Sequence, residues 1–339
     1  MAAAVRQILS TSPRGSAPDG ASTPCLIVNP RSFRAARGLA GQAGALAREH
    51  GADVIAVDDS EALTAAIDAI LARRQQRVMV LAGDGTVRAV VDQLAALPAG
   101  AWIPDLLVLP GGRTNLTAND LAAAGGALPA LRRALVAANA QRWDVGVIER
   151  RTLCIEQAPA PPRYGFWVGA AVIDGVIRRT HEHRARGAGV SSAGPLSTVT
   201  SLLRLGTLAL RGRSDIQAPM LDIDAGPAGR LHDRVRLLVA TTLHHRRGLF
   251  DPYASRSSDD LRLTVASNRA THFWRRLPRL LTGRFSAGMT PAHGFLSGSC
   301  EVVRIVGLDG YSLDGEAYDT DPGRSVVIRS GPRLRFFIP

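Results

Sequence analysis

Four residues, Gly83-Asp84-Gly85-Thr86, combine types that could hold a phosphate group. They directly follow the apolar, β-branched run at 78–81, and an apolar-periodic helix pattern starts at Val87. A strand, a glycine-rich turn and a helix N-terminus present backbone N–H groups and a helix dipole to an anion. The glycines allow close approach, and Thr86 can cap the helix or bond a phosphate oxygen. The pattern predicts a phosphate site in which a cation or polar network offsets Asp84; the alternative is an ordinary Asp-Gly turn.

Two more polar loops follow strand patterns in this part of the chain. Asn29-Pro30-Arg31-Ser32 comes after the apolar run at 25–28, and Pro110-Gly111-Gly112-Arg113-Thr114-Asn115 comes after the run at 105–109. Strand and helix patterns alternate up to residue 147, which predicts βαβ units and a doubly wound parallel sheet. Because the C-terminal ends of such strands gather at one edge, where ligands bind, we expect the three loops to lie side by side.

The pattern changes after residue 147. Helical periodicity fades, and short strands and turns dominate, which predicts mostly antiparallel strands in a β-sandwich. We therefore expect a disordered leader at 1–23, an α/β domain at 24–147 and a β-sandwich domain at 148–339. The extreme C-terminus is expected to be able to pack back on the first domain.

The amino-acid composition limits which reaction mechanisms and partners the chain can have. The chain has 339 residues, 46% of them hydrophobic, and a formal net charge of +12; all 41 Lys+Arg residues are arginine, which excludes lysine-dependent mechanisms. The arginine excess suggests an anionic partner: phosphate, anionic lipid or nucleic acid. Cys25, Cys154 and Cys300 form no CxxC pattern, which argues against a disulfide framework and fits a reducing compartment. No apolar run is long enough to span a membrane.

A fourth motif completes a family pattern. NPRS, GDGT, PGGxTN and Asp314-Gly315-Glu316 stand in the order typical of the diacylglycerol kinase catalytic-domain family, which the chain resembles over roughly residues 24–335. That family includes bacterial lipid kinases and sphingosine and ceramide kinases, and is related in fold to NAD kinases and phosphofructokinases. The resemblance implies an ATP-dependent kinase for diacylglycerol or a similar lipid, with residues 24–147 as the nucleotide-binding α/β domain and residues 148–339 as the lipid-substrate β-sandwich domain. A ceramide or sphingoid-base kinase and a catalytically inactive lipid-binding homologue stay open.

The resemblance also implies the site, with ATP and Mg²⁺ as cofactors. The residues that would bind ATP are Asn29, Pro30, Arg31, Gly83, Asp84, Gly85, Thr86, Gly111, Gly112, Arg113 and Asn115. Asp84 would sit by the phosphates or in the Mg²⁺-linked network. Asp314 and Glu316 match the motif in which a carboxylate accepts the lipid hydroxyl proton, and we expect Glu316 to orient or deprotonate that hydroxyl. Asp259 or Asp260 would carry a structural Mg²⁺.

Three positions depart from the family pattern: Ala82 replaces a glycine, Arg113 a threonine and Leu116 an aspartate. Arg113 is the sharpest departure, because a guanidinium brings a full charge and a planar fork of donors. It can clamp a phosphate bidentately, or it can pair with Asp84 and block the site. We expect the clamp. An NAD kinase would carry a further Asn-Glu motif after GDGT, which is absent, and a non-catalytic binding protein is the rival from another class.

Basic and aromatic residues mix at 272–285, where Phe273, Trp274 and several leucines stand among four arginines. We expect this stretch, with Arg178–Arg186, to dock on an anionic membrane surface; the alternative is a solvated basic face. Pro278 argues against one unbroken helix. The expected partners are thus a diacylglycerol- or ceramide-like lipid and the anionic membrane surface. No nucleic acid is expected as a partner, and a homodimer stays open. The expected location is cytoplasmic and peripheral, at the inner membrane surface.

Overall fold

The computed structural model describes residues 23–32, 35, 38–112, 118, 126–140, 146–175, 177–178, 218–243, 251–254 and 261–339. The predicted leader, Arg113, Asn115, Asp259 and Asp260 lie outside these residues. Cys25, Cys154 and Cys300 are all buried and free, as expected for a chain without a disulfide framework. Among the described residues, no helix is both long enough and apolar enough to cross a membrane.

The N-terminal half is built on four parallel strands in the order β4-β3-β1-β2. Its elements are β1 (Cys25–Val28), α1 (Leu39–Glu49), β2 (Asp53–Ala56), α2 (Ser60–Ala72), β3 (Arg77–Ala82), α3 (Asp84–Ala95), β4 (Asp105–Pro110) and α5 (Ala127–Asn139). The chain runs from β1 to the edge strand β2 and then returns past β1 to β3. This doubly wound order confirms the predicted fold class of this half.

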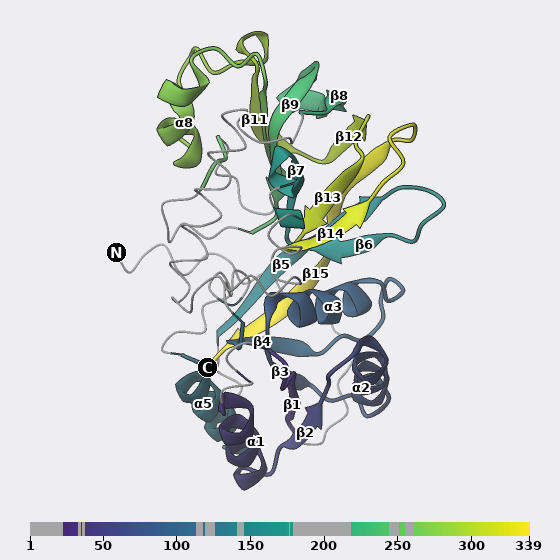
Figure 1. Cartoon of the computed structure of the whole chain (residues 1–339). Coiled ribbons are helices and arrows are strands. Elements are labelled where there is room, and N and C mark those ends of the chain that lie inside the picture. The colour runs from purple at the N-terminus through teal and green to yellow at the C-terminus, as the bar shows by residue number, and fades with distance from the viewer. Residues whose placement is uncertain are drawn as a thin grey trace.

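Helices cover both faces of the parallel sheet, α1 and α5 on one side and α2 and α3 on the other (Figure 1). On β3, Val78 and Val80 pack into the core under α2 and α3, whereas Met79 and Leu81 pack into the core under α1 and α5. A strand buried on both faces must be apolar at every position. This is why β3 reads as a continuous run rather than an alternating one.

The C-terminal half is almost entirely antiparallel strands around a second core, which confirms the predicted β-rich architecture. Its elements are β5 (Gly146–Glu156), β6 (Arg163–Gly165), β7 (Trp167–Ala171), β8 (Met220–Asp224), β9 (Arg230–Thr241), β10 (Leu261–Ser267), α8 (Phe273–Leu281), β11 (Phe295–Cys300), β12 (Val302–Val306), β13 (Gly310–Leu313), β14 (Glu316–Asp319) and β15 (Val326–Ile338). β9 connects two groups of strands in this half, because it pairs with β8 at its beginning and with β7 and β10 toward its end.

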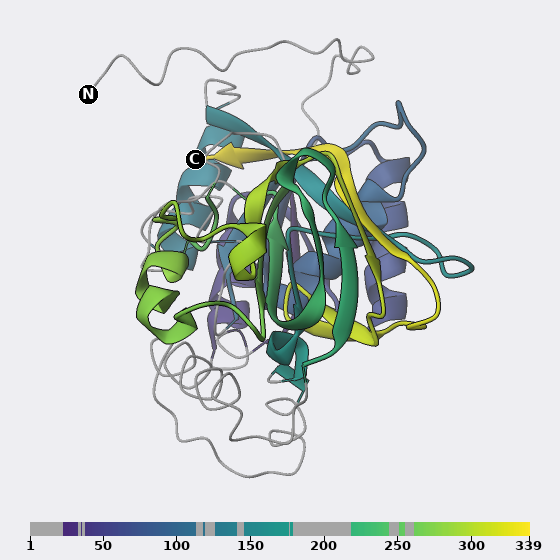
Figure 2. The ribbon, with the colours of Figure 1, turned by 90° about the horizontal axis from the view of Figure 1, so that it is seen from above.

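Two long strands join the halves. β5 and β15 pair antiparallel along almost their whole length, and the end of β15 also lies parallel to β4 at the pair Phe336–Leu106. Figure 1 shows both strands running from the β-rich half down to the parallel sheet, where the C-terminus lies, and Figure 2 shows from above how the β-rich half lies over that sheet. The two halves therefore share one continuous set of strands, which fixes any site between them.

Three local features differ from the sequence-based expectations. α3 begins at Asp84 rather than at Val87, so three residues of the GDGT motif form the first helical turn. The β13–β14 hairpin, which carries Asp314 to Glu316, was not foreseen as strands. The stretch 272–285 is not one unbroken helix, as expected, but Pro278 is not where the helix stops, because α8 runs through Pro278 and ends at Leu281. The helix is short enough to tolerate a residue that offers no N–H to the carbonyl four positions earlier.

Candidate functional site

The strand order itself creates the site. The connections from β1 and from β3 diverge to opposite sides of the sheet, which makes the gap between these two strands a topological switch point. Ligands of open α/β sheets bind outside the carboxyl ends of the strands at such a point. Asn29 follows β1 and Gly83 follows β3, so the first two predicted loops lie there. The third loop follows β4, the neighbour of β3.

Hydrogen bonds tie the first two loops together. The Asn29 side-chain amide donates to Thr86 Oγ1 over 2.8 Å, and the Gly83 N–H donates to Ser32 Oγ over 2.9 Å. Asn29 also accepts the Arg31 N–H on its Oδ1 over 2.9 Å, which fixes its amide orientation. The hydroxyl of Thr86 therefore serves a loop-to-loop contact rather than a helix cap. A single rigid surface results from residues more than fifty positions apart.

Glycine is required where the third loop meets β3. The Gly111 N–H bonds the Ala82 carbonyl over 3.1 Å, and a Cβ at Gly111 would lie 2.8–3.0 Å from backbone atoms of Ala82. Gly112 lies in ordinary contact distance of the second loop, since its Cα is 3.7 Å from where a Gly83 Cβ would be. The two glycines of PGG thus let the loop after β4 close onto the loop after β3.

The Asp314-Gly315-Glu316 motif forms the tip of the β13–β14 hairpin. Leu313 pairs with Glu316, which leaves a two-residue loop, and both loop residues have positive φ, +48° at Asp314 and +91° at Gly315. That is the geometry of a type I′ turn, for which Asp-Gly is a favoured sequence. The motif is therefore a hairpin turn from which Glu316 faces the GDGT motif, whereas the Asp314 carboxylate faces the backbone of Phe166 and Trp167.

Asp314 is held rigidly in a buried position. Its carboxylate accepts the Phe166 N–H at 3.0 Å and the Trp167 N–H at 2.8 Å, and its own N–H donates to the Trp167 carbonyl at 2.8 Å. Burial raises the pKa of Asp314 to about 7, against the two backbone N–H groups, which lower it; the charge of Asp84 adds to the rise and that of Arg88 opposes it. A carboxylate with a pKa near neutrality is suited to accept and release a proton.

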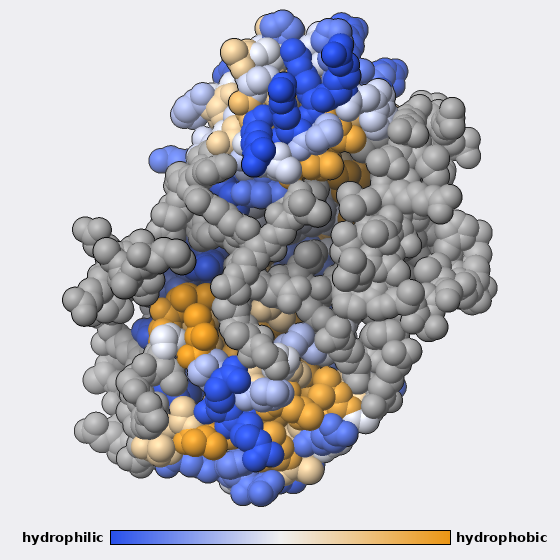
Figure 3. Space-filling view, turned by 90° about the vertical axis from the view of Figure 1, so that its left-hand side faces the viewer, coloured by the Kyte–Doolittle hydropathy of each residue, from blue (hydrophilic) through white to orange (hydrophobic). Residues whose placement is uncertain are grey.

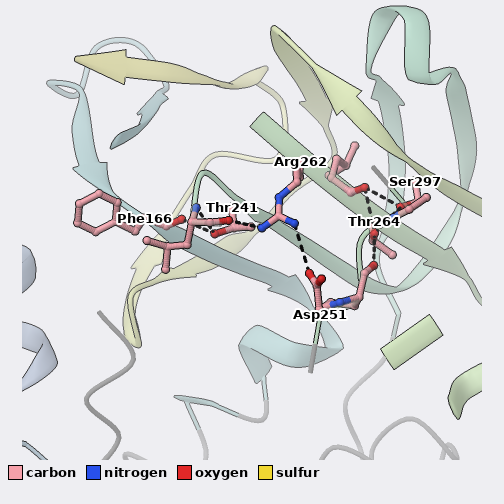
Figure 4. A network of polar contacts seen from close by, with 10 residues as sticks. Phe166, Thr241, Asp251, Arg262, Thr264 and Ser297 are labelled. Carbon is pink, nitrogen blue, oxygen red and sulfur yellow. Dashed lines mark hydrogen bonds and ion pairs between the residues drawn. The ribbon is translucent and has the colours of Figure 1, made fainter. Parts of the chain in front are cut away.

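Side-chain contacts behind Asp314 support its backbone partner. Thr241 Oγ1 donates to the Phe166 carbonyl over 2.8 Å (Figure 4). Beside it, the buried Arg262 guanidinium bonds the Leu243 carbonyl and pairs with Asp251 at 3.3 Å. Arg262 therefore supplies a buried positive charge to Asp251. It stands two positions after Asp260 in the sequence; Asp259 and Asp260, which were expected to hold Mg²⁺, lie outside the described residues. Within the described residues, no three His, Cys, Asp or Glu side chains are grouped to hold a metal.

Glu316 is fixed by a different set of partners. Its Oε2 pairs with Arg88 Nη2 at 2.8 Å and accepts the Tyr318 hydroxyl at 3.1 Å. Its Oε1 points at Gly85, where a Cβ would lie only 2.6 Å away. The Asp-Gly-Glu hairpin therefore touches the GDGT motif directly, and the missing side chain at Gly85 makes room for Glu316 as well as for any ligand at the helix N-terminus.

Arg88 is the centre of this contact. Its side chain is only 10% exposed, and it bridges Glu316 and Asp92, the latter at 3.2 Å. Burial alone would lower the pKa of Arg88, but Glu316, Tyr318 and Asp92 together raise it, so the guanidinium stays charged. Asp92 in turn accepts the Tyr164 N–H over 2.7 Å. Arg88 thus fastens helix α3 to the β-rich half instead of pointing at the helix N-terminus.

We expect a single methyl group at Gly85 to disturb this contact. In Gly85→Ala the new Cβ would overlap Glu316 Oε1, so the glutamate must move away from Arg88 or the hairpin must shift. Because the overlapped atom is the end of a flexible side chain, the fold should survive and the loss should fall on activity. Thermal unfolding and turnover, compared with Gly41→Ala at an unobstructed helical position, measure both. Equal turnover in the two variants would contradict the contact.

The structure therefore brings together most of the residues that the sequence singles out. Asn29, Pro30 and Arg31, the four residues of GDGT, Gly111, Gly112, Asp314 and Glu316 all lie in or beside the loops at the switch point. Arg31, however, pairs with Asp58 at 3.1 Å, so its guanidinium is engaged next to the loop. The sequence analysis did not reveal Tyr318 or the bridging role of Arg88; the spacing of Arg88 and Asp92 on one helix face was a signal for half of that bridge.

Comparisons with known proteins show what the chain resembles in sequence and in fold. Residues 23–148 match the family model of the diacylglycerol kinase catalytic domain. A crystal structure of a diacylglycerol kinase from Bacillus anthracis superimposes with a TM-score of 0.58 at 12% identity, covering 94% of this chain and 97% of that one. A second structure from that organism, provisionally assigned as a diacylglycerol kinase, gives 0.61 at 13% identity and covers 94% and 98%. At such identities these structures show a shared fold. No curated protein sequence matches the chain.

Proposed function

Since residues 23–148 belong to the diacylglycerol kinase catalytic-domain family, we propose that the chain is an ATP-dependent lipid kinase that phosphorylates the hydroxyl of diacylglycerol or a similar lipid. The observation that carries the proposal is the direct contact between Glu316 of the hairpin and Gly85 of the GDGT motif. It joins a phosphate-binding loop to a pair of carboxylates, and these are the two parts that transfer of a phosphoryl group to an alcohol needs.

The loops at the switch point fit the phosphates of ATP. Gly83 caps α3 without a side-chain hydrogen bond, so the first-turn N–H groups face the loops after β1 and β4. A helix N-terminus with glycine-lined surroundings is a good site for phosphate oxygens. Asn29, Thr86, Gly111 and Gly112 would hold the nucleotide there. Arg113 and Asn115 belong to the same loop and lie outside the described residues, so the expected Arg113 clamp stays a prediction.

Asp84 is the residue that fits a Mg²⁺ ion bound with the nucleotide. It occupies the first turn of α3, where the helix dipole stabilises a carboxylate, and its charge acts on Asp314. Mg²⁺ prefers one or two carboxylates together with phosphate oxygens. Bound there, the ion would neutralise the phosphate charge that builds up during transfer.

Asp314 is the residue that we assign as proton acceptor. Its raised pKa, about 7, makes the carboxylate basic enough to take the proton of an alcohol while it is still ionised in a large fraction of molecules at neutral pH. Two backbone N–H groups hold it in place. In the proposed step the lipid oxygen forms a bond to the γ-phosphorus, the bond to the ADP oxygen breaks, and the hydroxyl proton passes to Asp314.

Glu316 then takes the orienting role, one of the two roles that the sequence allows it. Arg88 and Tyr318 bond one of its oxygens and hold the side chain in a fixed position. The other oxygen faces Gly85 and the N-terminus of α3. From this position Glu316 can accept a hydrogen bond from the lipid hydroxyl and align its oxygen with the phosphates.

A kinase assay over a lipid panel tests the proposal. The chain is incubated with γ-labelled ATP and Mg²⁺ and with diacylglycerol, ceramide, sphingosine or NAD⁺, and label in each acceptor is measured. We expect label in a lipid, with diacylglycerol preferred. Asp84→Asn is the matched control, because it keeps shape and hydrogen bonding but removes the charge; it should fold normally and lose most activity.

Other outcomes would point elsewhere. Label in NAD⁺ alone would indicate a nucleotide kinase with the same fold. Binding of a lipid without any ATP turnover would indicate a non-catalytic homologue. If Asp84→Asn unfolds and loses activity only in proportion, the aspartate has a structural role, and the assignment of the phosphate centre is wrong.

A further inference from the structure

The most unbalanced charge in the described structure lies around α8. Between Asp260 and Glu301 the sequence contains no acidic residue and six arginines. Figure 1 places α8 at the end of the β-rich half, far from the helices of the parallel sheet, and Figure 3 shows a strongly hydrophilic surface at that end. The exposed side chains of Trp274, Arg275, Arg279 and Arg284 form this surface, which is called the α8 surface below.

α8 has an anchored face and a free face. Phe273 and Leu280 are buried in a small apolar core together with Phe295, so the helix is fixed to the sheet. On the outer side Arg275, Arg279 and Arg284 are exposed, and Trp274 is 39% exposed although it is one of the largest apolar side chains. Its ring meets Phe273 edge-on at 5.1 Å, so the indole is held at the rim of the helix.

The outer arginines lack acidic partners within the described part of the chain. Ion pairs are found there for Arg230, Arg262 and Arg269, but none for Arg275, Arg279 or Arg284. Arg276 is different, because it donates to the Thr271 carbonyl and hydroxyl and lies over the Phe295 ring. Three positive charges and one indole are thus exposed on α8 and the turn that follows it, while the apolar side of the helix is buried in the protein.

We propose that this α8 surface docks the protein on an anionic lipid bilayer. Arginines next to a tryptophan match the level of the lipid headgroups, where the charges meet phosphates and the indole reaches the acyl boundary. Because the apolar face of α8 is buried in the protein, docking is shallow and depends mainly on charge. A nucleic-acid duplex would satisfy the arginines as well, but its bases are already stacked and give the exposed indole no partner.

One sequence-based expectation about this surface is corrected. Arg178 was expected to contribute to membrane docking, but its guanidinium pairs with Asp174 at 2.5 Å and with Asp319 at 2.6 Å. It also donates to the Tyr318 carbonyl at 2.6 Å. Arg178 is therefore neutralised and holds strand β14. Residues 179–186 lie outside the described residues, so α8 carries the proposal alone.

Co-sedimentation with vesicles tests the proposal without nucleotide, so its outcome does not depend on the proposed reaction. The full chain is mixed with vesicles of phosphatidylcholine alone or of phosphatidylcholine and phosphatidylglycerol in equal parts. Each arginine near an anionic surface contributes about fivefold to partitioning. The double variant Arg275→Gln/Arg279→Gln should therefore bind the anionic vesicles roughly 30-fold more weakly. Binding should also fall as salt is raised, because salt screens exposed charges.

Arg48→Gln/Arg132→Gln is the matched control. It removes the same charge from exposed positions on α1 and α5, at the other end of the molecule, and should bind like the parent. Trp274→Phe should abolish the blue shift of tryptophan emission that the parent shows with anionic vesicles. Circular dichroism confirms that each variant is folded. Equal loss in both double variants, equal binding to neutral vesicles, or binding to DNA or RNA but not to vesicles would each overturn the proposal.

Discussion

Replacing Asp314 by asparagine is expected to lower turnover by about 10²–10⁴-fold, the usual effect of losing a general base. Asparagine suits this position because it tolerates the left-handed backbone conformation that Asp314 adopts. It keeps the size of the side chain but cannot accept the proton. ATP affinity should change little. Steady-state kinetics with diacylglycerol and calorimetric titration with ATP separate the two effects.

The pH dependence of the parent follows from the same residue. Because the pKa of Asp314 is raised to about 7, the carboxyl is protonated and inactive below that pH. The specificity constant kcat/KM should therefore rise with pH by about tenfold per unit below pH 7 and level off above it. A profile that is already flat at pH 5 would show that an acid with an ordinary pKa is the base, and it would return that role to Glu316.

Glu316→Gln is the internal comparison. If Glu316 orients the hydroxyl, its amide can still offer one acceptor oxygen, so the variant should lose less turnover than Asp314→Asn and keep the same pH profile. The reverse order, with Glu316→Gln losing about 10²–10⁴-fold and Asp314→Asn near parent activity, would exchange the two assignments.

Replacing Arg88 by methionine is expected to have the largest effect on stability. The change leaves Glu316 and Asp92 without their shared cation, and breaking a fully buried pair costs about 3–5 kcal/mol. Because the Glu316 side chain is 40% exposed, solvent reduces the cost, and we expect about 2–3 kcal/mol from urea unfolding. Turnover should also fall, up to about 10²-fold, because Glu316 is no longer held against Gly85.

The pH profile separates positioning from plain destabilisation in this variant. The positive charge of Arg88 lowers the pKa of Asp314, so removing it should move the pH midpoint upward. Arg163→Met is the matched control, since Arg163 stacks on the same Tyr318 ring at 4.2 Å but forms no ion pair with Glu316 or Asp92. If Arg163→Met matches Arg88→Met in stability and midpoint, aromatic packing rather than the ion pairs explains the effect.

The loops at the switch point could be predicted because local sequence determines them. A buried parallel strand must be apolar throughout, and a strand followed by a glycine-rich turn and a helix is recognisable in one stretch, as at Val78 to Val87. The order of these units then implies a doubly wound sheet and the edge at which its loops meet. For this reason the sequence alone predicts that Asn29, Gly83 and Gly111 lie in one site.

The contacts of Asp314 and Glu316 could not be predicted in the same way. They depend on partners more than 140 residues away, such as the Phe166 and Trp167 N–H groups, and on the pairing of β13 with β7. No local pattern specifies which strands of an antiparallel sheet become neighbours. The Asp-Gly pair predicts a turn, but that the turn buries a carboxylate and raises its pKa is a property of the assembled fold.

The measurement that tests the central claim most directly is a single-turnover reaction with excess protein, γ-labelled ATP and diacylglycerol, run in parallel for the parent and Asp314→Asn. We predict that the parent moves the label into phosphorylated diacylglycerol, and that Asp314→Asn binds ATP equally well but forms this product about 10²-fold or more slowly. If label is released as inorganic phosphate with none in lipid, or if both proteins form the lipid product at the same rate, the proposed site does not carry out this reaction.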